Sequence, residues 1–200
     1  MILYGGRLSS FVRRVELWLA LQDRPVERVY ASAFAEDFGG LLAVNPLGRV
    51  PVLATDTGES LFETSAIIDY LEDTADPAAR LIPHSGPERW RVMQILALSH
   101  GISEKAIALY YETEKRPSQY QWEQWQARLS TQISNGLAAL DEQIAAMPPS
   151  RAIEIAVCCA YDINAVTSPA LVSAGLSHLK TVSETANRHP DFARTYPRLA

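Results

Sequence analysis

Residues 45–53, with the sequence NPLGRVPVL, constrain the fold of this chain more than any other segment. Pro51 stands directly before a short β-like run. Because a proline has no N–H to donate to a sheet, we expect Pro51 at the first residue of a strand or in a cis turn. A cis peptide bond before Pro51 would leave the N–H and C=O of Val50 open to a ligand. This segment therefore predicts a site that binds a peptide by its main chain.

A second segment, residues 63–67 (ETSAI), opens a helical pattern that continues to Leu71. The first N–H groups of a helix have no partner within the helix, so together with the Thr64 hydroxyl they can hold a carboxylate. The Glu63 carboxylate beside them can pair with an ammonium group. Glu63 and Thr64 would also serve as an ordinary helix cap. The two segments together predict a site for a small anionic peptide.

Apolar residues alternate with period two only in the first third of the chain. This pattern predicts four strands, at residues 2–4, 26–30, 50–54 and 60–62. The DTG sequence at 56–58 predicts a hairpin between the last two strands. Apolar residues that recur every fourth position predict a helix from the serines at 9 and 10 to Leu21. The expected order is βαβ followed by ββα.

The expected domain division follows from the places where these patterns change. Residues 74–87 contain mainly Ala, Asp, Pro, Ser and Gly, as a linker does, and Pro87 fits the first position of a helix. After Pro87 the sequence has helical periodicity throughout, and prolines divide it into segments of about 15–30 residues. We therefore expect an α/β domain at 1–75, a linker at 76–86 and an all-helical bundle domain at 87–200.

Composition and charge argue against several classes of protein. The net charge of −5 gives no basic footprint for nucleic acid, and no apolar run approaches the roughly 20 residues that span a bilayer. The start of the chain lacks the features of a signal peptide, so we expect a cytoplasmic protein with no membrane or nucleic-acid partner. Cys158 and Cys159 are adjacent in an apolar run, which is typical of buried thiols. The four histidines lack the spacing of a metal pair, so we expect no metal.

The two ligand-binding segments, together with ILY at 2–4 and SSFVRRV at 9–15, resemble the cytosolic glutathione transferase family in order and spacing. The resemblance is to its serine-type, bacterial members and extends over nearly the whole chain. It implies a thioredoxin-like glutathione-binding domain followed by the helical domain, a homodimer, glutathione as co-substrate and a role in detoxification. In the second domain, residues 153–157 resemble a buried helix of the family. Arg151 and Glu154 stand where the family carries a capping Ser or Thr and an Asp, so the capping hydroxyl is missing unless Ser150 supplies it.

The chemistry of such a site centres on the glutathione thiol, whose pKa is about 8.5 and which attacks electrophiles only as the thiolate. A hydroxyl group at the N-terminus of a helix can stabilise that thiolate. Matching Arg14 and Val15 to the family's first helix places Ser9 on the catalytic serine and Ser10 where a proline is common. Ser9 is therefore the first candidate and Ser10 the fallback, although either would also serve as an N-cap. Tyr4, at the end of the first strand, is a third candidate and fits a packed strand aromatic better.

The resemblance also implies the residues that bind the rest of glutathione. Arg49 and Val50 precede the cis-proline Pro51, and Glu63 and Thr64 occupy the family's acidic and hydroxyl positions for the γ-glutamyl end. Arg49 would equally be a solvated surface charge. No residue matches the one that holds the glycyl carboxylate in the family.

The second substrate implied by the resemblance is a small hydrophobic electrophile, whose pocket in the family draws on the long helices of the second domain. Four residues fit one wall of such a pocket and the core of the bundle equally well: Ile102, Ala106, Tyr110 and Tyr111. Three aromatic residues fit a pocket, a dimer surface or the bundle core: Tyr120, Trp122 and Trp125.

The sequence therefore predicts a glutathione transferase in which Ser9 activates the thiolate for attack on a hydrophobic electrophile. Two alternatives stay open. One is a glutathione-dependent isomerase, peroxidase or dehalogenase, which uses the same thiolate. The other is a catalytically weak glutathione- or ligand-binding protein of the same fold.

Overall fold

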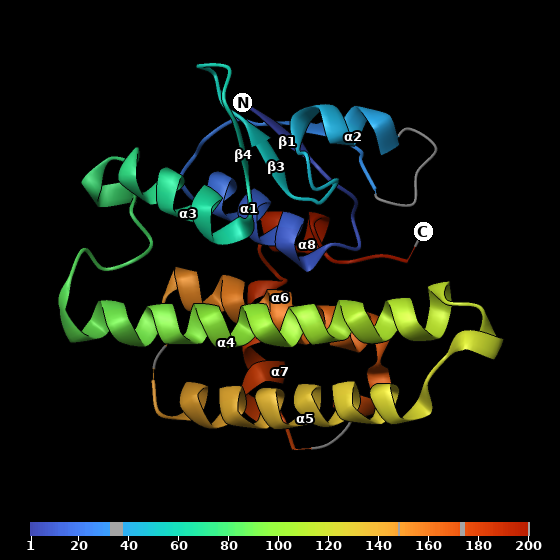
Figure 1. The fold of residues 1–200 in the computed structure, drawn as a ribbon. Helices are drawn as coiled ribbons and strands as arrows, with labels where there is room; N and C mark the ends of the chain where they lie inside the picture. The colour runs from blue at the N-terminus through green and yellow to red at the C-terminus, as the bar shows by residue number, and fades with distance from the viewer. Residues whose placement is uncertain (33–37, 148, 173–174, 200) are drawn as a thin grey trace. The chain divides into compact units, whose positions relative to one another are not determined.

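The computed structural model describes residues 1–32, 38–147, 149–172 and 175–199. The chain forms two compact units: Met1–Ile82 together with Asp191–Ala200, and Pro83–Pro190 (Figure 1). The second unit is therefore inserted in the chain between two segments of the first.

The first unit is built on a four-stranded sheet with the order β2-β1-β3-β4. Its strands are β1 (Ile2–Tyr4), β2 (Glu27–Val29), β3 (Val52–Ala54) and β4 (Ser60–Phe62). β2 runs parallel to β1, whereas β3 runs antiparallel to both β1 and β4. All four expected strands are present, and β2 and β3 are shorter than predicted. The antiparallel β3–β4 pair confirms the expected hairpin.

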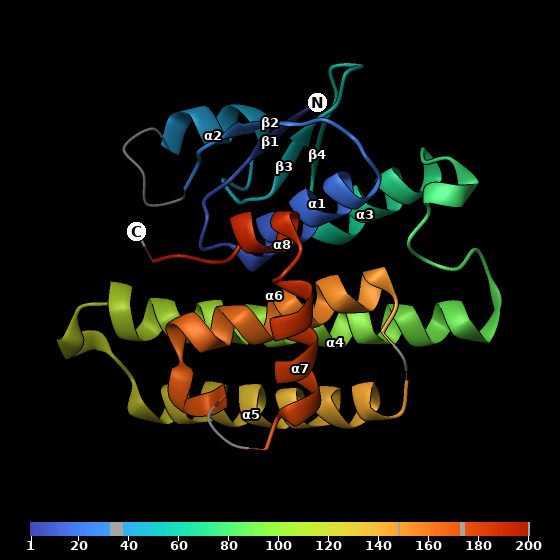
Figure 2. The same ribbon diagram turned by 180° about the vertical axis from the view of Figure 1, so that it is seen from behind.

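Helices cover both faces of this sheet. α1 (Ser10–Leu21) and α3 (Thr64–Asp73) lie on one face and pack against each other, and α2 (Phe38–Val44) lies on the other face (Figure 1 and Figure 2). Val15 and Leu19 of α1 are fully buried, which confirms the predicted apolar side of this helix. A short 3-10 helix, η1 (Pro77–Ala79), follows α3.

The short helix α8 (Pro190–Arg194) and the residues after it are bound to α1. The buried guanidinium of Arg13 on α1 donates hydrogen bonds to the Phe192 carbonyl oxygen (3.3 Å) and to the Thr195 hydroxyl (3.4 Å). It also lies 5.5 Å from the centre of the Tyr196 ring, within the range of a cation–π contact. These contacts make the segment after residue 190 part of the first unit.

A buried carboxylate joins three parts of the first unit. Glu72 on α3 accepts hydrogen bonds from Trp18 Nε1 (2.7 Å) and Gln22 Nε2 (2.9 Å) at the end of α1. It also accepts from the main-chain N–H groups of Leu81 (3.1 Å) and Ile82 (2.9 Å). Four donors around a side chain that is only 8% exposed compensate for its removal from water.

The second unit is the helical bundle that the sequence predicts. Its long helices are α4 (Gly86–Tyr110), α5 (Glu123–Ala145), α6 (Arg151–Thr167) and α7 (Ser177–Ala186). Three short helical segments connect them: the π-helix η2 (Tyr111–Lys115) and the 3-10 helices η3 (Ser118–Tyr120) and η4 (Pro169–Val172). α4 packs against α5 and α6, and α7 packs against the same two helices.

Two helix starts in this unit differ in detail from the expectation. α4 begins at Gly86, so Pro87 is its second residue; there a missing N–H costs nothing, because first-turn N–H groups have no acceptor within the helix. Ser150 is the N-cap residue of α6, but its side chain makes no capping hydrogen bond. Glu154 instead forms an ion pair with Arg151 (2.6 Å). Cys158 on α6 and its neighbour Cys159 are buried, as predicted.

The close approach of α4 and α5 depends on a glycine. A Cβ atom added at Gly136 of α5 would lie 2.7 Å from Ile102 Cγ1 of α4, nearer than real Cβ contacts. A Cβ atom added at Gly101, the residue before Ile102, would meet nothing within 4 Å. Ile102 itself is 3% exposed, so it belongs to the core of the bundle.

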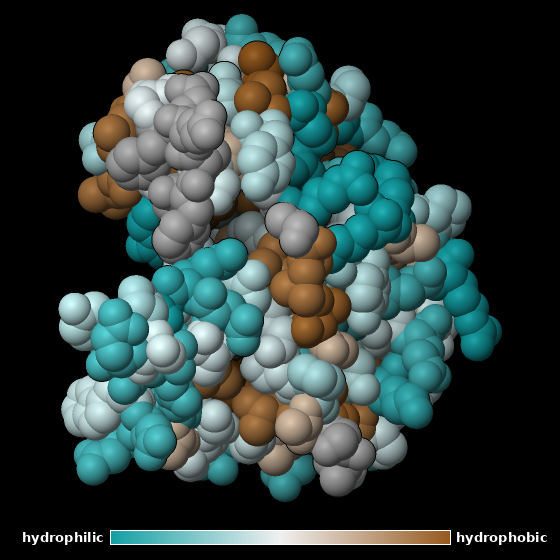
Figure 3. Space-filling model, turned by 90° about the vertical axis from the view of Figure 1, so that its right-hand side faces the viewer, coloured by the Kyte–Doolittle hydropathy of each residue, from teal (hydrophilic) through white to brown (hydrophobic). Residues whose placement is uncertain are grey.

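Apolar surface occurs in both units. On the face drawn in Figure 3 it is broken into separate small areas between hydrophilic side chains. Exposed large apolar side chains include Leu47 (64%), Trp90 (77%) and Met93 (41%). None of the helices in the described part of the chain has the length and apolar character that a membrane crossing requires.

Candidate active site

The register of the sheet brings the three predicted site segments to one end of it. β1 ends at Tyr4, and Val52 at the start of β3 lies opposite Tyr4. Phe62 at the end of β4 lies opposite Val52. The loop that leads from β1 to Ser9, the Val50–Pro51 peptide before β3 and the Glu63–Thr64 pair after β4 therefore all emerge at this end, which we call the candidate site.

Ser9 is the N-cap residue of α1, with extended backbone (φ −72°, ψ 110°). Its hydroxyl oxygen accepts a hydrogen bond from the Val12 N–H at 3.3 Å. Because the oxygen acts here as an acceptor, its own O–H proton is left to donate to a further group. The position at the helix N-terminus adds the partial positive charge of the free N–H groups. The Ser9 hydroxyl is thus arranged to stabilise an anion.

Ser10 and Tyr4 are less suited to that role. Ser10 is 2% exposed, and its buried hydroxyl has no hydrogen-bond partner among the described residues. A ligand at the surface cannot reach it without rearrangement. Tyr4 lies within the sheet, paired with Val29 and Val52, as expected of a packed strand aromatic.

Gly5 fixes the base of the loop before Ser9. Its φ angle is +147°, and a Cβ atom there would lie 2.2 Å from Val12 Cγ2, so only glycine fits against α1. Its N–H donates to the Val29 carbonyl oxygen (3.0 Å), and its own carbonyl accepts from Arg28 Nη2 (2.9 Å). Sequence reasoning assigned no role to this glycine, and its signal was the Gly5–Gly6 pair directly after a strand.

Asn45 holds the turn that precedes Pro51. Asn45 is 1% exposed, and its Nδ2 donates to the Arg49 carbonyl oxygen at 2.7 Å. Its Oδ1 accepts from the Leu47 N–H (3.0 Å) and its own carbonyl accepts from the Gly48 N–H (2.8 Å). The Val50–Pro51 peptide bond is cis, as expected. Asn45 belonged to the predicted segment without an assigned role, and its signal was the Asn-Pro turn sequence.

Glu63 is the N-cap residue of α3, and its side chain accepts a hydrogen bond from the Ser65 N–H at 3.0 Å. Its φ angle is +74°, a conformation that costs a non-glycine residue about 1–3 kcal/mol and is concentrated at functional sites. Glu63 and Ser65 are exposed, whereas Thr64 is 2% exposed. The Thr64 side chain is thus turned into the unit, and the Glu63 carboxylate and the start of α3 face solvent.

A network of arginines lies beside β1. Arg28 on β2 forms an ion pair with Glu16 of α1, and Arg194 of α8 pairs with the same carboxylate and with Asp191 (3.0 Å). Burial lowers the pKa of Arg28, and the nearby charges of Arg194 and Arg7 lower it further. Among the residues that the structure describes, the cations at this place therefore outnumber the carboxylates.

Of the seven predicted pocket residues, Tyr110 at the end of α4 is half-buried and Tyr111 at the start of η2 is 42% exposed. The other five divide into two groups. Ile102 and Ala106 are buried, and Ile102 packs against Gly136, so core packing accounts for it. The aromatic side chains of Tyr120, Trp122 and Trp125 are 67%, 60% and 36% exposed, which excludes the bundle core for them. A pocket or a dimer surface stays open for these three. No three His, Cys, Asp or Glu side chains of the described ranges gather as a metal site.

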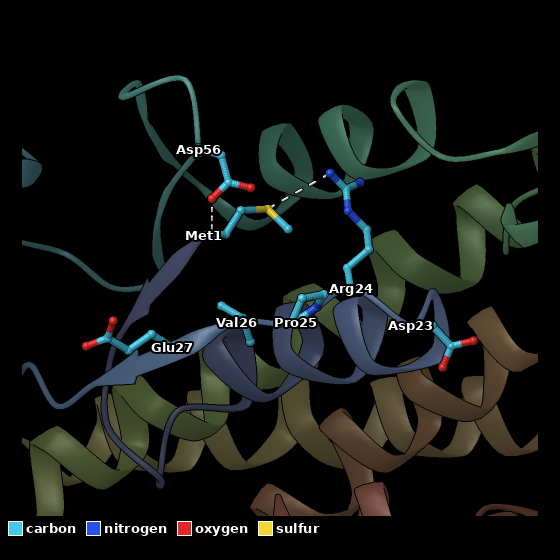
Figure 4. A pocket seen from close by; sticks show the side chains of 7 residues that line it. All are labelled: Met1, Asp23, Arg24, Pro25, Val26, Glu27 and Asp56. Atoms are coloured by element: carbon cyan, nitrogen blue, oxygen red, sulfur yellow. Dashed lines mark hydrogen bonds and ion pairs between the residues drawn. The ribbon is translucent and has the colours of Figure 1, made fainter.

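A surface pocket of about 540 Å³ lies at the opposite end of the sheet (Figure 4). It is lined by Met1, Asp23, Arg24, Pro25, Val26, Glu27 and Asp56. Ile2, at the start of β1, pairs with Glu27 and Ala54, which places this pocket at the far end of β1 from Tyr4. The Met1 amino group pairs with Asp56 (2.5 Å), and Arg24 contacts the Met1 sulfur (3.9 Å). None of the predicted site residues lines it.

Comparison with known proteins identifies the family of this chain. Residues 3–79 match the family model for the glutathione S-transferase N-terminal domain. The chain is 32% identical over 141 residues to the GST-like protein YibF of Escherichia coli (strain K12), covering 70% of this chain and 68% of YibF. It is 29% identical over 152 residues to a probable maleylacetoacetate isomerase of Vibrio cholerae, covering 72% of this chain and 68% of that protein.

The solved structures give the same result over the full length. A glutathione transferase family member from Pseudomonas fluorescens Pf-5, crystallised with bound glutathione, superimposes with a TM-score of 0.85 at 28% identity and covers 99% of both chains. The fold is a thioredoxin-like domain combined with a helical bundle, as predicted. The chain belongs to the glutathione S-transferase family, which confirms the family predicted from the sequence.

Proposed function

We propose that this protein is a glutathione S-transferase that activates the glutathione thiol for attack on an electrophile. The observation that carries the proposal is the convergence of the Ser9 hydroxyl, the Val50 main chain and the start of α3 at one end of the sheet. These groups match the three parts of glutathione: its thiol, its peptide main chain and its γ-glutamyl end. The family relative that binds glutathione supports the choice of ligand.

In this proposal Ser9 stabilises the thiolate. Lowering the thiol pKa by about 2 units requires roughly 2.7 kcal/mol of preference for the charged form. A hydroxyl donor to the thiolate supplies about 1.5–3 kcal/mol, and the N-terminus of α1 adds about 0.3–2 kcal/mol. The two contributions together reach the roughly 2.7 kcal/mol required. The site therefore needs no separate base to hold the thiol proton.

The other site residues hold the rest of the tripeptide. The N–H and C=O of Val50 pair with the cysteinyl main chain, and Asn45 and Pro51 fix the peptide that presents them. Glu63 pairs with the ligand's ammonium group, and the N–H groups at the start of α3 hold its α-carboxylate. The Thr64 side chain is buried, so its hydroxyl contributes less to binding the γ-glutamyl carboxylate than the sequence suggests. Arg49 is exposed beside Val50 and adds positive charge for an anionic ligand.

A glutathione-dependent isomerase is the second candidate function. The similarity to a probable maleylacetoacetate isomerase of Vibrio cholerae favours it. In an isomerase the thiolate adds to the substrate and leaves again unchanged, so the same site residues serve both reactions. The two functions differ in whether glutathione is consumed.

We also propose a cytoplasmic homodimer, as the family resemblance implies. The exposed side chains of Leu47 in the first unit and of Trp90 and Met93 in the second supply apolar surface for such an interface.

Calorimetry with glutathione, followed by turnover assays, tests the proposed function. We expect binding at millimolar glutathione or below and glutathione-dependent turnover of a general aryl halide. Turnover of a hydroperoxide, or of a cis-alkene diacid without loss of glutathione, would identify the peroxidase or isomerase instead. Binding without any turnover would identify a ligand-binding protein. Absence of binding by the folded protein would refute the assignment as a whole.

A further inference from the structure

The side of the candidate site away from the proposed glutathione position carries an excess of positive charge. The sheet order β2-β1-β3-β4 places the Val50 peptide and the start of α3 on the β3–β4 side of the end of β1, from which the loop leads to Ser9. Neighbouring strands lie about 4.8 Å apart, so a tripeptide on that side leaves the β2 side of the sulfur open. The electrophile, rather than a part of glutathione, therefore approaches the thiolate from the β2 side.

On the β2 side, three guanidinium groups meet two carboxylates. Glu16 forms ion pairs with Arg28 and Arg194, and the Asp191 carboxylate forms an ion pair with the Nε of Arg194. No carboxylate of the described residues contacts the third cation, Arg7, which is exposed. The charge of Arg7 is nevertheless near enough to lower the pKa of the Arg28 side chain. Within the described part of the chain, one positive charge therefore stays uncompensated next to the loop.

Arg7 stands in the loop between β1 and Ser9. Its Cα atom is at most about 7 Å from that of Ser9, because two trans peptide units separate them. The base of this loop is rigid, since Gly5 is held by both Val29 and Arg28. The ring of Tyr30, which is 68% exposed, lies against Gly6, where an added Cβ would be 3.4 Å from its Cε2 atom. An exposed aromatic face and an uncompensated guanidinium thus flank the path to the sulfur.

We propose that the electrophilic substrate carries a carboxylate, and that Arg7 binds this carboxylate while Tyr30 contacts the apolar body of the substrate. The proposal rests on the proposed glutathione-dependent function and names the substrate class that function leaves open. A planar guanidinium binds a carboxylate through two parallel hydrogen bonds and therefore also orients the electrophile.

A matched pair of electrophiles tests the proposal: 4-chloro-3-nitrobenzoate and its methyl ester. In each, the thiolate attacks the carbon that bears chlorine, the S–C bond forms, the C–Cl bond breaks and chloride leaves with the electron pair. Each kcat/KM is divided by the uncatalysed rate with glutathione, which removes the intrinsic difference in reactivity. We expect the wild type to prefer the acid by about 10–100-fold, the value of one charge-assisted contact.

Variants of Arg7 test whether this residue causes the preference for the acid over the ester. Arg7→Gln should abolish the preference for the acid while leaving the ester rate and the affinity for glutathione within a few fold. Arg7→Lys should keep part of the preference, because it keeps the charge without the fork geometry. Arg128→Ala, which removes an exposed arginine of α5 in the second unit, is the control and should change neither substrate.

Two results would overturn the proposal. One is a wild type with equal corrected rates for acid and ester. The other is an Arg7→Gln variant that loses glutathione affinity but keeps the preference for the acid, since Arg7 would then bind a carboxylate of glutathione itself. Calorimetry with the two glutathione conjugates gives the same comparison without turnover: the acid conjugate should bind at least about 10-fold more tightly to the wild type than to Arg7→Gln. A wild type that turns over neither electrophile would refute the proposed function. A wild type that binds the two conjugates equally would refute the role of Arg7.

Discussion

At the scale of single residues, Ser9 uses one oxygen atom for two purposes: it caps α1, and we propose that it donates to the glutathione thiolate. Ser9→Ala should leave glutathione affinity within a few fold, raise the pKa of the bound thiol and lower turnover by about 10–1,000-fold. The pH profile of kcat should shift upward with that pKa. Thiolate absorbance titrated with pH on the bound ligand measures the shift directly.

Ser9→Gly separates the two purposes, because glycine is nearly as good an N-cap as serine whereas alanine costs about 0.5–2 kcal/mol. Both variants should lose turnover, but only Ser9→Ala should lower the melting temperature clearly. Ser10→Ala is the second control and should be nearly silent in turnover, since the Ser10 hydroxyl is buried. A crippled Ser10→Ala enzyme with an intact Ser9→Ala enzyme would show that the assignment is wrong by one residue.

Glu72 carries a stability prediction of its own. Glu72→Ala would leave four donors without their acceptor: those of Trp18, Gln22 and Ile82, which are buried, and that of Leu81, which is part-buried. We expect a loss of at least about 3 kcal/mol, which corresponds to a fall in melting temperature of roughly 6–12 °C. Glu72→Gln keeps one carbonyl oxygen for most of these donors and should cost less. Thermal unfolding followed by circular dichroism gives both values, and an unchanged midpoint for Glu72→Ala would contradict this account.

At the scale of elements, two glycines of the bundle should respond in opposite directions to the same substitution. Gly136→Ala gains about 1 kcal/mol of helix propensity but forces a Cβ to 2.7 Å from Ile102, and overpacking costs about 1–3 kcal/mol. Gly101→Ala gains the same propensity where a Cβ meets nothing within 4 Å. We expect Gly136→Ala to destabilise and Gly101→Ala to stabilise the protein in urea unfolding. Stabilisation by both would show that α4 and α5 adjust freely.

The elements were predictable where local sequence determines them. Period-two runs located all four strands, and Pro51 marked the cis turn before β3. The candidate site was predictable in outline for the same reason, because each of its segments adjoins a strand: one follows β1, one precedes β3 and one follows β4. The partners of Glu72, the turn held by Asn45 and the burial of Thr64 were not, since each depends on side chains that only the folded chain brings together. The domain limits, the serine-type mechanism and the individual site residues stay predictions.

At the scale of the whole molecule, the homodimer is the prediction to test. Obligate interfaces of this kind bury on the order of 2,000 Å² or more, so the dimer should persist at micromolar concentration and in moderate salt. Light scattering in line with size exclusion should give twice the 22.1 kDa mass of the chain. A mass near 22.1 kDa over the whole concentration range would refute a stable dimer and leave the glutathione proposal untouched.

The contact of Arg13 with Thr195 has a consequence for how the chain is made. The two residues are 182 positions apart, and ribosomes add about 5–20 residues per second, so Thr195 is added roughly 10–40 s after Arg13. The second unit, Pro83–Pro190, is contiguous in the chain and is synthesised entirely within this interval. The helix that carries Ser9 at its N-terminus thus gains its contacts with the segment after residue 190 only after the whole second unit has been synthesised.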